Sequence, residues 1–105
     1  MKINISKAAK QDLKNISFYI SENDCTEQAR ETIIRLRKAI DSLQQLPKRG
    51  VRVRELVALG QKSYREIFCD TYRIIYRVYD TSLRVYLVVD KRRDLLPLLT
   101  QRRID

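Results

Sequence analysis

The sequence contains no histidine and no tryptophan, and its 105 residues include only two glycines, two prolines and two cysteines. Without histidine, the side chain that most often moves protons near neutral pH is missing. Gly50 and Gly60 are too far apart to form a glycine-rich phosphate-binding loop. No group of cysteine, histidine and carboxylate residues has the spacing of metal ligands. These absences exclude most familiar enzyme classes, and we expect neither a metal nor a cofactor.

The cysteines are too few to indicate a disulfide-stabilised secreted domain. Cys25 and Cys69 form no CxxC pair, and a small secreted domain usually carries more cysteines. The first residues do not resemble a signal peptide, and no apolar run approaches the length of a membrane span. We therefore expect a cytoplasmic protein with reduced thiols and no membrane partner, with an internal Cys25–Cys69 disulfide as the alternative.

Positive charge is concentrated in the second half of the chain. The formal net charge is +9, from 22 Lys+Arg and 13 Asp+Glu. Residues 1–46 carry 8 basic and 6 acidic side chains (+2), whereas residues 47–105 carry 14 and 7 (+7). The second half would attract nucleic acid, an acidic protein segment or an acidic membrane surface, unless it is simply a basic solvated surface. The length predicts a single domain over residues 1–105.

Hydrophobic periodicity predicts two helices near the N-terminus. Ser6 is a suitable N-cap, and from Lys7 to about Glu22 the apolar residues recur every three or four positions. A second helix, capped by Thr26 or Asp24, shows the same period and should stop near residue 45, because Pro47 follows. A short polar turn joins the two segments. An antiparallel helical hairpin is therefore expected.

The period then changes to that of β-strands. Alternation predicts a short strand at residues 2–5, an extended segment from Val51 through Val53 to about Leu56, and strands at 64–69, 72–79 and 83–89. The connections at 70–71 and 80–82 are short enough for hairpins. The predicted class is α+β: the helical hairpin packs on a twisted antiparallel sheet of three to four strands.

A short C-terminal helix is also expected. Asp90 could cap it, and Leu95, Leu96, Leu99 and Ile104 would follow its apolar face. Pro97 must kink this helix or confine it to a short piece after position 96.

Alternation along the strands separates an apolar face from a face rich in arginine and tyrosine. The apolar face would hold Tyr72, Ile74, Tyr76, Val78, Leu83, Val85, Leu87 and Val89. The opposite face would present Arg73, Arg77, Tyr79, Arg84 and Tyr86. Such side chains can hold phosphates and stack on bases. The alternative is a solvated sheet face with ordinary cross-strand pairs.

A second basic cluster follows the last strand. Lys91, Arg92 and Arg93 are adjacent, and Arg102 and Arg103 lie near the C-terminus. A cationic loop at a strand end could bind an anion or an acidic partner. The alternative is an exposed turn in which Asp94 partly offsets its neighbours.

Taken in order, these segments resemble the RelE/ParE superfamily of type II toxins, and most closely its ParE-like branch. The resemblance covers almost the whole chain and is strongest in the strand Tyr72-Arg73-Ile74-Ile75-Tyr76-Arg77. Its other parts are Ser6-Lys7-Ala8-Ala9, Asp12-Leu13, Ile16, Tyr19-Ile20, Leu46-Pro47, Gly50, Arg54-Glu55-Leu56, Tyr64-Arg65, Val85, Val89, Arg92-Arg93-Asp94-Leu95 and Leu98-Leu99.

The resemblance implies a helical hairpin on a twisted antiparallel sheet, and it implies a protein partner. Members of the superfamily are neutralised by a cognate antitoxin whose C-terminal segment folds onto the toxin. Such a segment would set apolar side chains in a groove and acidic ones against the toxin's cations. Contact with operator DNA would be made only through the antitoxin.

The superfamily divides by target. RelE-like members cut messenger RNA on the ribosome, using Lys and Arg for charge stabilisation and a C-terminal Tyr or His for proton transfer. ParE-like members poison DNA gyrase without known chemistry of their own. Here Arg73 and Arg92 or Arg93 match the nuclease arginines, but Glu66 would repel a phosphate and Leu98 stands near the position of the C-terminal Tyr. Tyr79 or Tyr86 could replace it only through unusual placement.

The sequence therefore predicts a ParE-like, non-enzymatic inhibitor of DNA gyrase, with a ribosome-dependent ribonuclease using Arg73 and Arg92 as the alternative. A third interpretation is an inactive member that remains as a co-repressor with its antitoxin. Seven cations are expected to contact the target or the antitoxin: Arg65, Arg73, Arg77, Arg84, Lys91, Arg92 and Arg93.

Overall fold

The computed structural model describes residues 1–102, which form four helices and five strands. In chain order these are β1 (Lys2–Ile5), α1 (Lys7–Asn23), α2 (Thr26–Ser42), β2 (Val51–Arg52), α3 (Arg54–Ala58), β3 (Tyr64–Cys69), β4 (Tyr72–Val78), β5 (Ser82–Asp90) and α4 (Leu95–Arg102). Residues 103–105, including Ile104 of the predicted last helix, lie outside the described part. Within residues 1–102, no helix is both long and apolar enough to cross a membrane.

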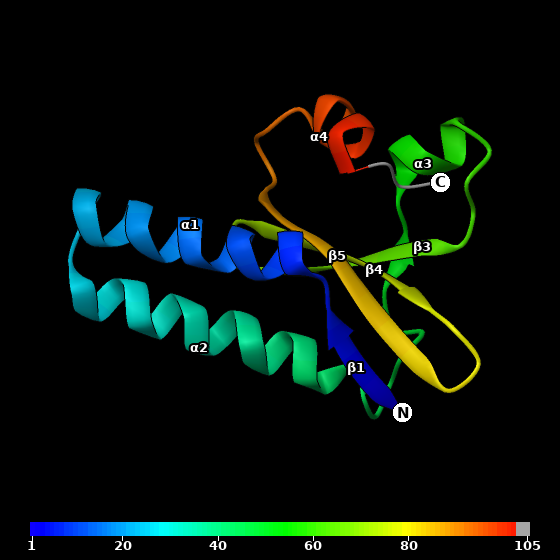
Figure 1. Ribbon diagram of the computed structural model, residues 1–105, viewed down its shortest axis with the longest axis horizontal. Coiled ribbons are helices and arrows are strands. Elements are labelled where there is room, and N and C mark those ends of the chain that lie inside the picture. The colour runs from blue at the N-terminus through cyan, green and yellow to red at the C-terminus, as the bar shows by residue number, and fades with distance from the viewer. Residues whose placement is uncertain (103–105) are drawn as a thin grey trace.

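The predicted helical hairpin is confirmed, with one change of cap. The Ser6 hydroxyl accepts a hydrogen bond from the Ala9 amide at 3.0 Å and so caps α1. The second cap is neither Thr26 nor Asp24: the thiol sulfur of Cys25 accepts from the Gln28 amide at 3.4 Å. In Figure 1, α1 and α2 run antiparallel, and their connecting turn projects beyond the sheet.

The sheet has five strands in the order β1-β5-β4-β3-β2, one more than the upper prediction. It is mixed rather than purely antiparallel, because β1 pairs with β5 in parallel. Two parallel strands cannot be joined by a tight turn and need a long crossover connection. Here that connection runs from the end of β1 to the start of β5 and contains most of the chain. The β3–β4 hairpin closes with two residues, and the first of them, Asp70, adopts φ +54, which aspartate tolerates.

Core residues lie on both faces of the sheet, which corrects the prediction of an open arginine–tyrosine face for Arg73 but not for Tyr79 and Arg84, which are exposed. The first core lies between the sheet and α1 and α2, and its largest buried side chain is Tyr76. The second core lies on the opposite face, where Leu56 of α3 and Leu95 and Leu99 of α4 pack against Ile75. Arg73, expected on an open surface, is only 8% exposed.

A bulge in β5 explains why its predicted faces were partly wrong. Ile75 pairs with Leu87 but the next residue, Tyr76, pairs with Val85, so Tyr86 is the extra residue. Beyond it the alternation is inverted. Leu87 therefore joins the second core, whereas Val88 joins the first.

Two further elements differ from the sequence prediction. The segment expected to stay extended to about Leu56 forms only the two-residue β2 and then turns into α3, where Leu56 is buried. Strand β5 continues through Asp90, so this residue does not cap α4. The helix instead starts at Leu95, and Asp94 accepts a hydrogen bond from the Leu96 amide at 3.3 Å. Pro97 causes no break because it lies in the first turn, where its missing N–H has no helical partner.

Gly50 allows the chain to approach β4 closely. Its amide donates to the Tyr76 hydroxyl at 3.0 Å, and an added Cβ would lie 2.6 Å from that hydroxyl and 2.7 Å from the Glu66 carbonyl oxygen. We expect Gly50→Ala to lower the free energy of unfolding by about 1–3 kcal/mol, because a backbone carbonyl cannot move aside cheaply. Urea denaturation measures this loss, and an unchanged midpoint would contradict the close approach. Gly60→Ala separates this clash from backbone strain: Gly60 has φ +85 and no neighbour within 4 Å of the added Cβ, so a loss there of about 1–2 kcal/mol would come from the left-handed backbone alone.

Candidate functional site

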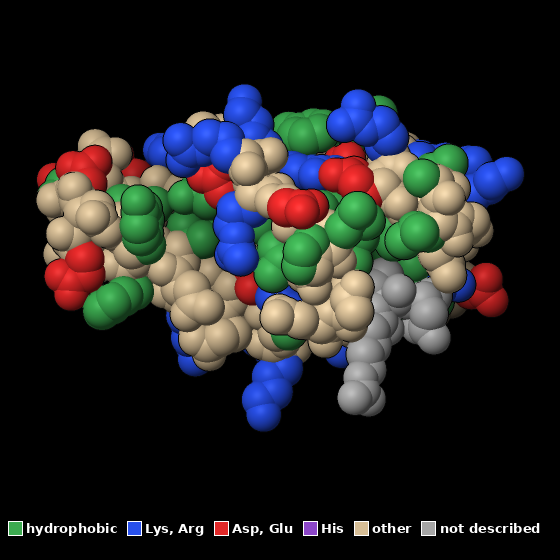
Figure 2. Space-filling view, turned by 90° about the horizontal axis from the view of Figure 1, so that it is seen from above, with side chains coloured by type: hydrophobic (Ala, Val, Ile, Leu, Met, Phe, Trp, Pro, Cys, Tyr) green, Lys and Arg blue, Asp and Glu red, His purple; other side chains and the backbone are tan. Residues whose placement is uncertain are grey.

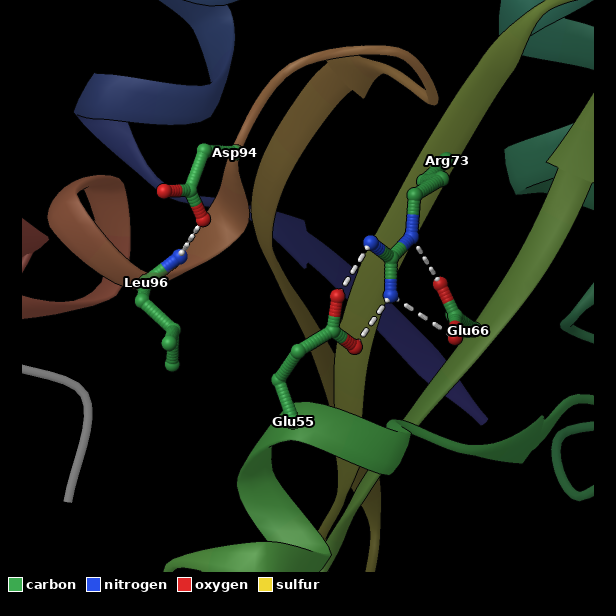
Figure 3. Close-up of polar contacts among 5 residues, drawn as sticks. All are labelled: Glu55, Glu66, Arg73, Asp94 and Leu96. Atoms are coloured by element: carbon green, nitrogen blue, oxygen red, sulfur yellow. Dashed lines mark hydrogen bonds and ion pairs between the residues drawn. The ribbon is translucent and has the colours of Figure 1, made fainter.

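The arginine of the Tyr-Arg strand motif is held between two carboxylates. The Arg73 Nε donates to Glu66 Oε1 at 2.6 Å, and Nη2 donates to Glu66 Oε2 at 3.1 Å. Nη1 and Nη2 donate to the two carboxylate oxygens of Glu55, each at 2.8 Å. Figure 3 shows the guanidinium lying between Glu66 of β3 and Glu55 of α3. Four of its five N–H groups are therefore used within the protein.

The hairpin register could have predicted one of these partners. Phe68 pairs with Arg73 across the two-residue turn, so Glu66 is the diagonal neighbour of Arg73 on the same face. Glu55 could not be predicted in this way, because it comes from α3, a helix that the sequence pattern did not indicate.

Hydrogen bonding to Arg73 holds Glu55 in its ionised form. It lowers the pKa of Glu55 to about 2, although partial burial acts in the opposite direction. The two carboxylates in turn raise the pKa of Arg73. At neutral pH, Glu55 is therefore an ion-pair partner and a weak base.

This depressed pKa predicts an acid-sensitive contribution to stability. A carboxylate whose folded pKa lies below its ordinary value stabilises the fold above that ordinary value, and the contribution is lost as the pH falls toward the folded pKa. Glu55→Gln should therefore cost most at pH 6–7, and the difference from the parent protein should shrink by roughly 3 kcal/mol between about pH 5 and pH 2. Urea denaturation across this range measures it. A difference that stays constant with pH would contradict the ion pair.

A groove between α1, β5 and α4 brings together cations and apolar side chains. Its volume is about 670 Å³. Ile16 and Tyr19 of α1 form one wall, and Leu98 of α4 forms part of the other. Arg92 and Arg93 also line it. The Tyr19 side chain belongs to the exposed apolar surface, with 65% of the residue accessible.

The basic loop after β5 is exposed, and its cations differ in how far they are neutralised. Arg92 donates from its backbone and its guanidinium to Asp90, with the ion pair at 2.9 Å. The bond to Arg92 lowers the pKa of Asp90. Lys91 and Arg93 form no ion pair with any residue in 1–102, so this loop keeps a net positive charge, and Arg93 places an unpaired cation at the groove.

An ion pair that the sequence analysis missed ties both ends of the chain to the sheet. Asp12 Oδ1 accepts from Arg102, and Asp12 Oδ2 accepts from the Val88 amide at 3.0 Å. Arg102 also donates to the Tyr86 carbonyl at 2.8 Å. These contacts join α1 and α4 to the bulged part of β5, and both Asp12 and Arg102 line the groove. The sequence did offer one indication of this ion pair. Asp12 lies beside the buried positions Ala9 and Leu13 of α1, and a carboxylate so close to the core usually needs a cationic or N–H partner.

The remaining predicted contact residues lie in different places. Arg65 donates to the Gly50 carbonyl at 2.8 Å, so it holds the loop before β2. Arg77 lies with its guanidinium 5.1 Å from the ring centroid of Tyr79, and Arg84 lies 5.7 Å from that of Tyr86. Viewed from the side of α3 and α4, basic side chains follow one long edge of the surface, with acidic and apolar groups among them (Figure 2). The structure therefore separates the seven cations into several sites.

Tyr86, at this end of the sheet, is unsuited to accept a proton. The hydroxyls of Tyr79 and Tyr86 share a hydrogen bond at 2.5 Å. Burial, and to a smaller extent this hydrogen bond, raises the pKa of Tyr86 to about 12. At cellular pH, Tyr86 is a neutral phenol rather than a general base.

The fold of this chain is similar to that of a chain in a solved toxin–antitoxin structure. The structure described as "Chromosomal ParDE TA system from P. aeruginosa" matches with a TM-score of 0.71 and 16% sequence identity. The match covers 86% of this chain and 95% of that one. A search of curated proteins finds no match.

The sequence itself matches the family described as "ParE toxin of type II toxin-antitoxin system, parDE" over residues 3–96. The chain therefore belongs to the ParE toxin family of type II toxin–antitoxin systems. The resemblance inferred from the sequence, and its ParE-like branch, are confirmed.

Proposed function

We propose that this toxin inhibits DNA gyrase by binding it, without chemistry of its own, and that a cognate antitoxin neutralises it. Membership of the ParE family supports a gyrase target, and the state of Arg73 supports a non-enzymatic mode. The carrying observation is that Arg73 donates to both Glu55 and Glu66. A phosphate at this position would have to displace two carboxylates.

The other requirements of a metal-free ribonuclease are also poorly met. Glu55, with its pKa near 2, would remove a ribose hydroxyl proton inefficiently, and Tyr86, with its pKa near 12, stays protonated. Arg92 and Arg73, the two arginines that a nuclease would use together, lie in different sites. Arg92 pairs with Asp90 and lines the groove, whereas Arg73 does not line it. These features favour binding over messenger cleavage.

We infer that the groove beside the basic loop receives the antitoxin. An acidic segment with apolar anchors would match its chemistry, because apolar side chains from α1, β5 and α4 line the groove together with Arg92 and Arg93. On this proposal Arg92 and Arg93 contact the antitoxin, and Lys91 adds its charge from the same loop. Arg65 and Arg73, which are bound within the fold, would act on either partner only by shaping the surface.

Expression of the toxin without its antitoxin tests the proposed function. Growth should stop with signs of DNA damage, while a reporter messenger RNA stays intact. Cleavage of the reporter at preferred codons would contradict the proposal in favour of the ribonuclease. Unchanged growth at a verified level of folded toxin would contradict it in favour of an inactive co-repressor.

A further inference from the structure

Two arginines at the far end of the sheet face each other without an acidic partner. Arg77 of β4 and Arg84 of β5 are directly paired across the hairpin. Like charges in this position destabilise a sheet, so a neighbouring anion would be stabilising. Arg73 and Arg102 each have a carboxylate partner. Among residues 1–102, neither Arg77 nor Arg84 forms an ion pair. Asp80, in the turn that joins the two strands, bonds to neither.

Tyrosine rings surround these cations. The Arg77 guanidinium lies 5.5 Å from the Tyr64 ring centroid and 5.1 Å from that of Tyr79, and Arg84 lies 5.7 Å from that of Tyr86. Tyr64 is buried and packs edge-on against Tyr86 with centroids 5.6 Å apart. Tyr79, 39% exposed, is the ring that a ligand can reach. We call Arg77, Tyr79, Arg84 and Tyr86 the Arg–Tyr platform.

We propose that the Arg–Tyr platform binds an unpaired nucleic-acid strand, with the guanidinium groups on consecutive phosphates and a base stacked on Tyr79. Planar guanidinium forks match phosphate oxygens, and base–aromatic stacking is tolerant of sequence. An acidic peptide would use the cations but would have nothing to stack on the exposed part of the Tyr79 ring. A duplex conceals the faces of its bases, so the unpaired strand fits best.

The platform is held in place before any ligand arrives. Hydrogen bonding fixes the Tyr79 and Tyr86 hydroxyls to each other, and Arg102 anchors the Tyr86 backbone to α4. The two tyrosine side chains would therefore lose little freedom on binding. Strand binding by the platform can be tested apart from gyrase inhibition, because the assay contains only the toxin and labelled nucleic acid.

Fluorescence anisotropy with labelled dT12 and rU12 tests the proposal on the purified toxin. Arg77→Gln with Arg84→Gln should weaken binding at least tenfold in 50 mM salt, and Tyr79→Leu about fivefold or more. The double variant should also lower the salt slope by about 1.4, as expected for two phosphates on a single strand. Preference for dT12 or for rU12 distinguishes DNA from RNA as the source, and equal binding assigns the platform to both.

The control variant is Arg30→Gln with Arg37→Gln, which removes the same charge from exposed positions of α2. It should change the affinity less than twofold. Equal losses in the two double variants, no detectable binding, or equal binding of a duplex would each overturn the proposal. So would displacement of dT12 by poly-glutamate as effectively as by unlabelled dT12, which would assign an acidic peptide. Arg84→Gln alone, at an exposed position, should still weaken binding about threefold, which guards against a folding defect in the double variant.

Discussion

Replacement of Arg73 by alanine is expected to lower the free energy of unfolding by about 3–5 kcal/mol, because it leaves a buried charge without its partner. Glu66 is 5% exposed and would lose its ion pair, and Glu55 would lose the contact that joins α3 to the sheet. Urea denaturation at pH 7 measures the change. A loss below about 1 kcal/mol would contradict the structural role that we assign to Arg73.

A second substitution separates the ion pair from ordinary side-chain packing. Glu66→Gln added to Arg73→Ala removes the unpaired charge, so it should recover part of the lost stability. Failure to recover any would indicate that the cost comes from the cavity alone. Loss of ribonuclease activity in Arg73→Ala would not identify Arg73 as a catalytic group, because the same substitution weakens the fold.

Charge reversal at the basic loop should have the largest effect on a partner. We expect Arg92→Glu with Arg93→Glu to weaken antitoxin binding about 10–100-fold at 150 mM salt, through both lost attraction and new repulsion. Arg93→Glu alone should account for most of the effect, since Arg92 is already paired with Asp90. Isothermal titration of the toxin with its cognate antitoxin measures the affinities.

The matched control reverses two exposed cations of α2, a helix that contributes no residue to the lining of the groove. Arg30→Glu with Arg37→Glu makes the same change in net charge at exposed positions of α2. Its effect should stay within about threefold. Equal weakening in the two proteins would mean that overall charge, rather than the groove, attracts the antitoxin.

The elements that depend on local spacing could be predicted from the sequence. The Ser6 cap and the three-to-four-residue period of α1 and α2 produced the helical hairpin, and two-residue alternation produced β3 and β4. Each of these is determined mainly by which side chains can share a face. The fold class was therefore accessible without coordinates.

The errors arose where distant contacts decide the conformation. The bulge at Tyr86 changes which face each later side chain occupies, yet strand composition on both sides is the same. Helix α3 is only five residues long and has no side-chain cap, so its stability comes from Leu56 in the core and Glu55 on Arg73.

The candidate site was only partly predictable for the same reason. Composition identified the cations of the second half, and the strand-end position identified residues 91–93. Neither observation indicated that carboxylates would neutralise Arg73 and leave Arg77 and Arg84 without an acidic partner. That difference depends on α3 and the register of two hairpins, which bring carboxylates to one arginine and none to the others.

The most direct test of the account is the supercoiling of relaxed plasmid by purified gyrase in the presence of the purified toxin. We expect inhibition that increases with toxin, survives the conservative change Arg73→Lys in folded protein, and is relieved by equimolar antitoxin. Full gyrase activity at a large molar excess of folded toxin would contradict it.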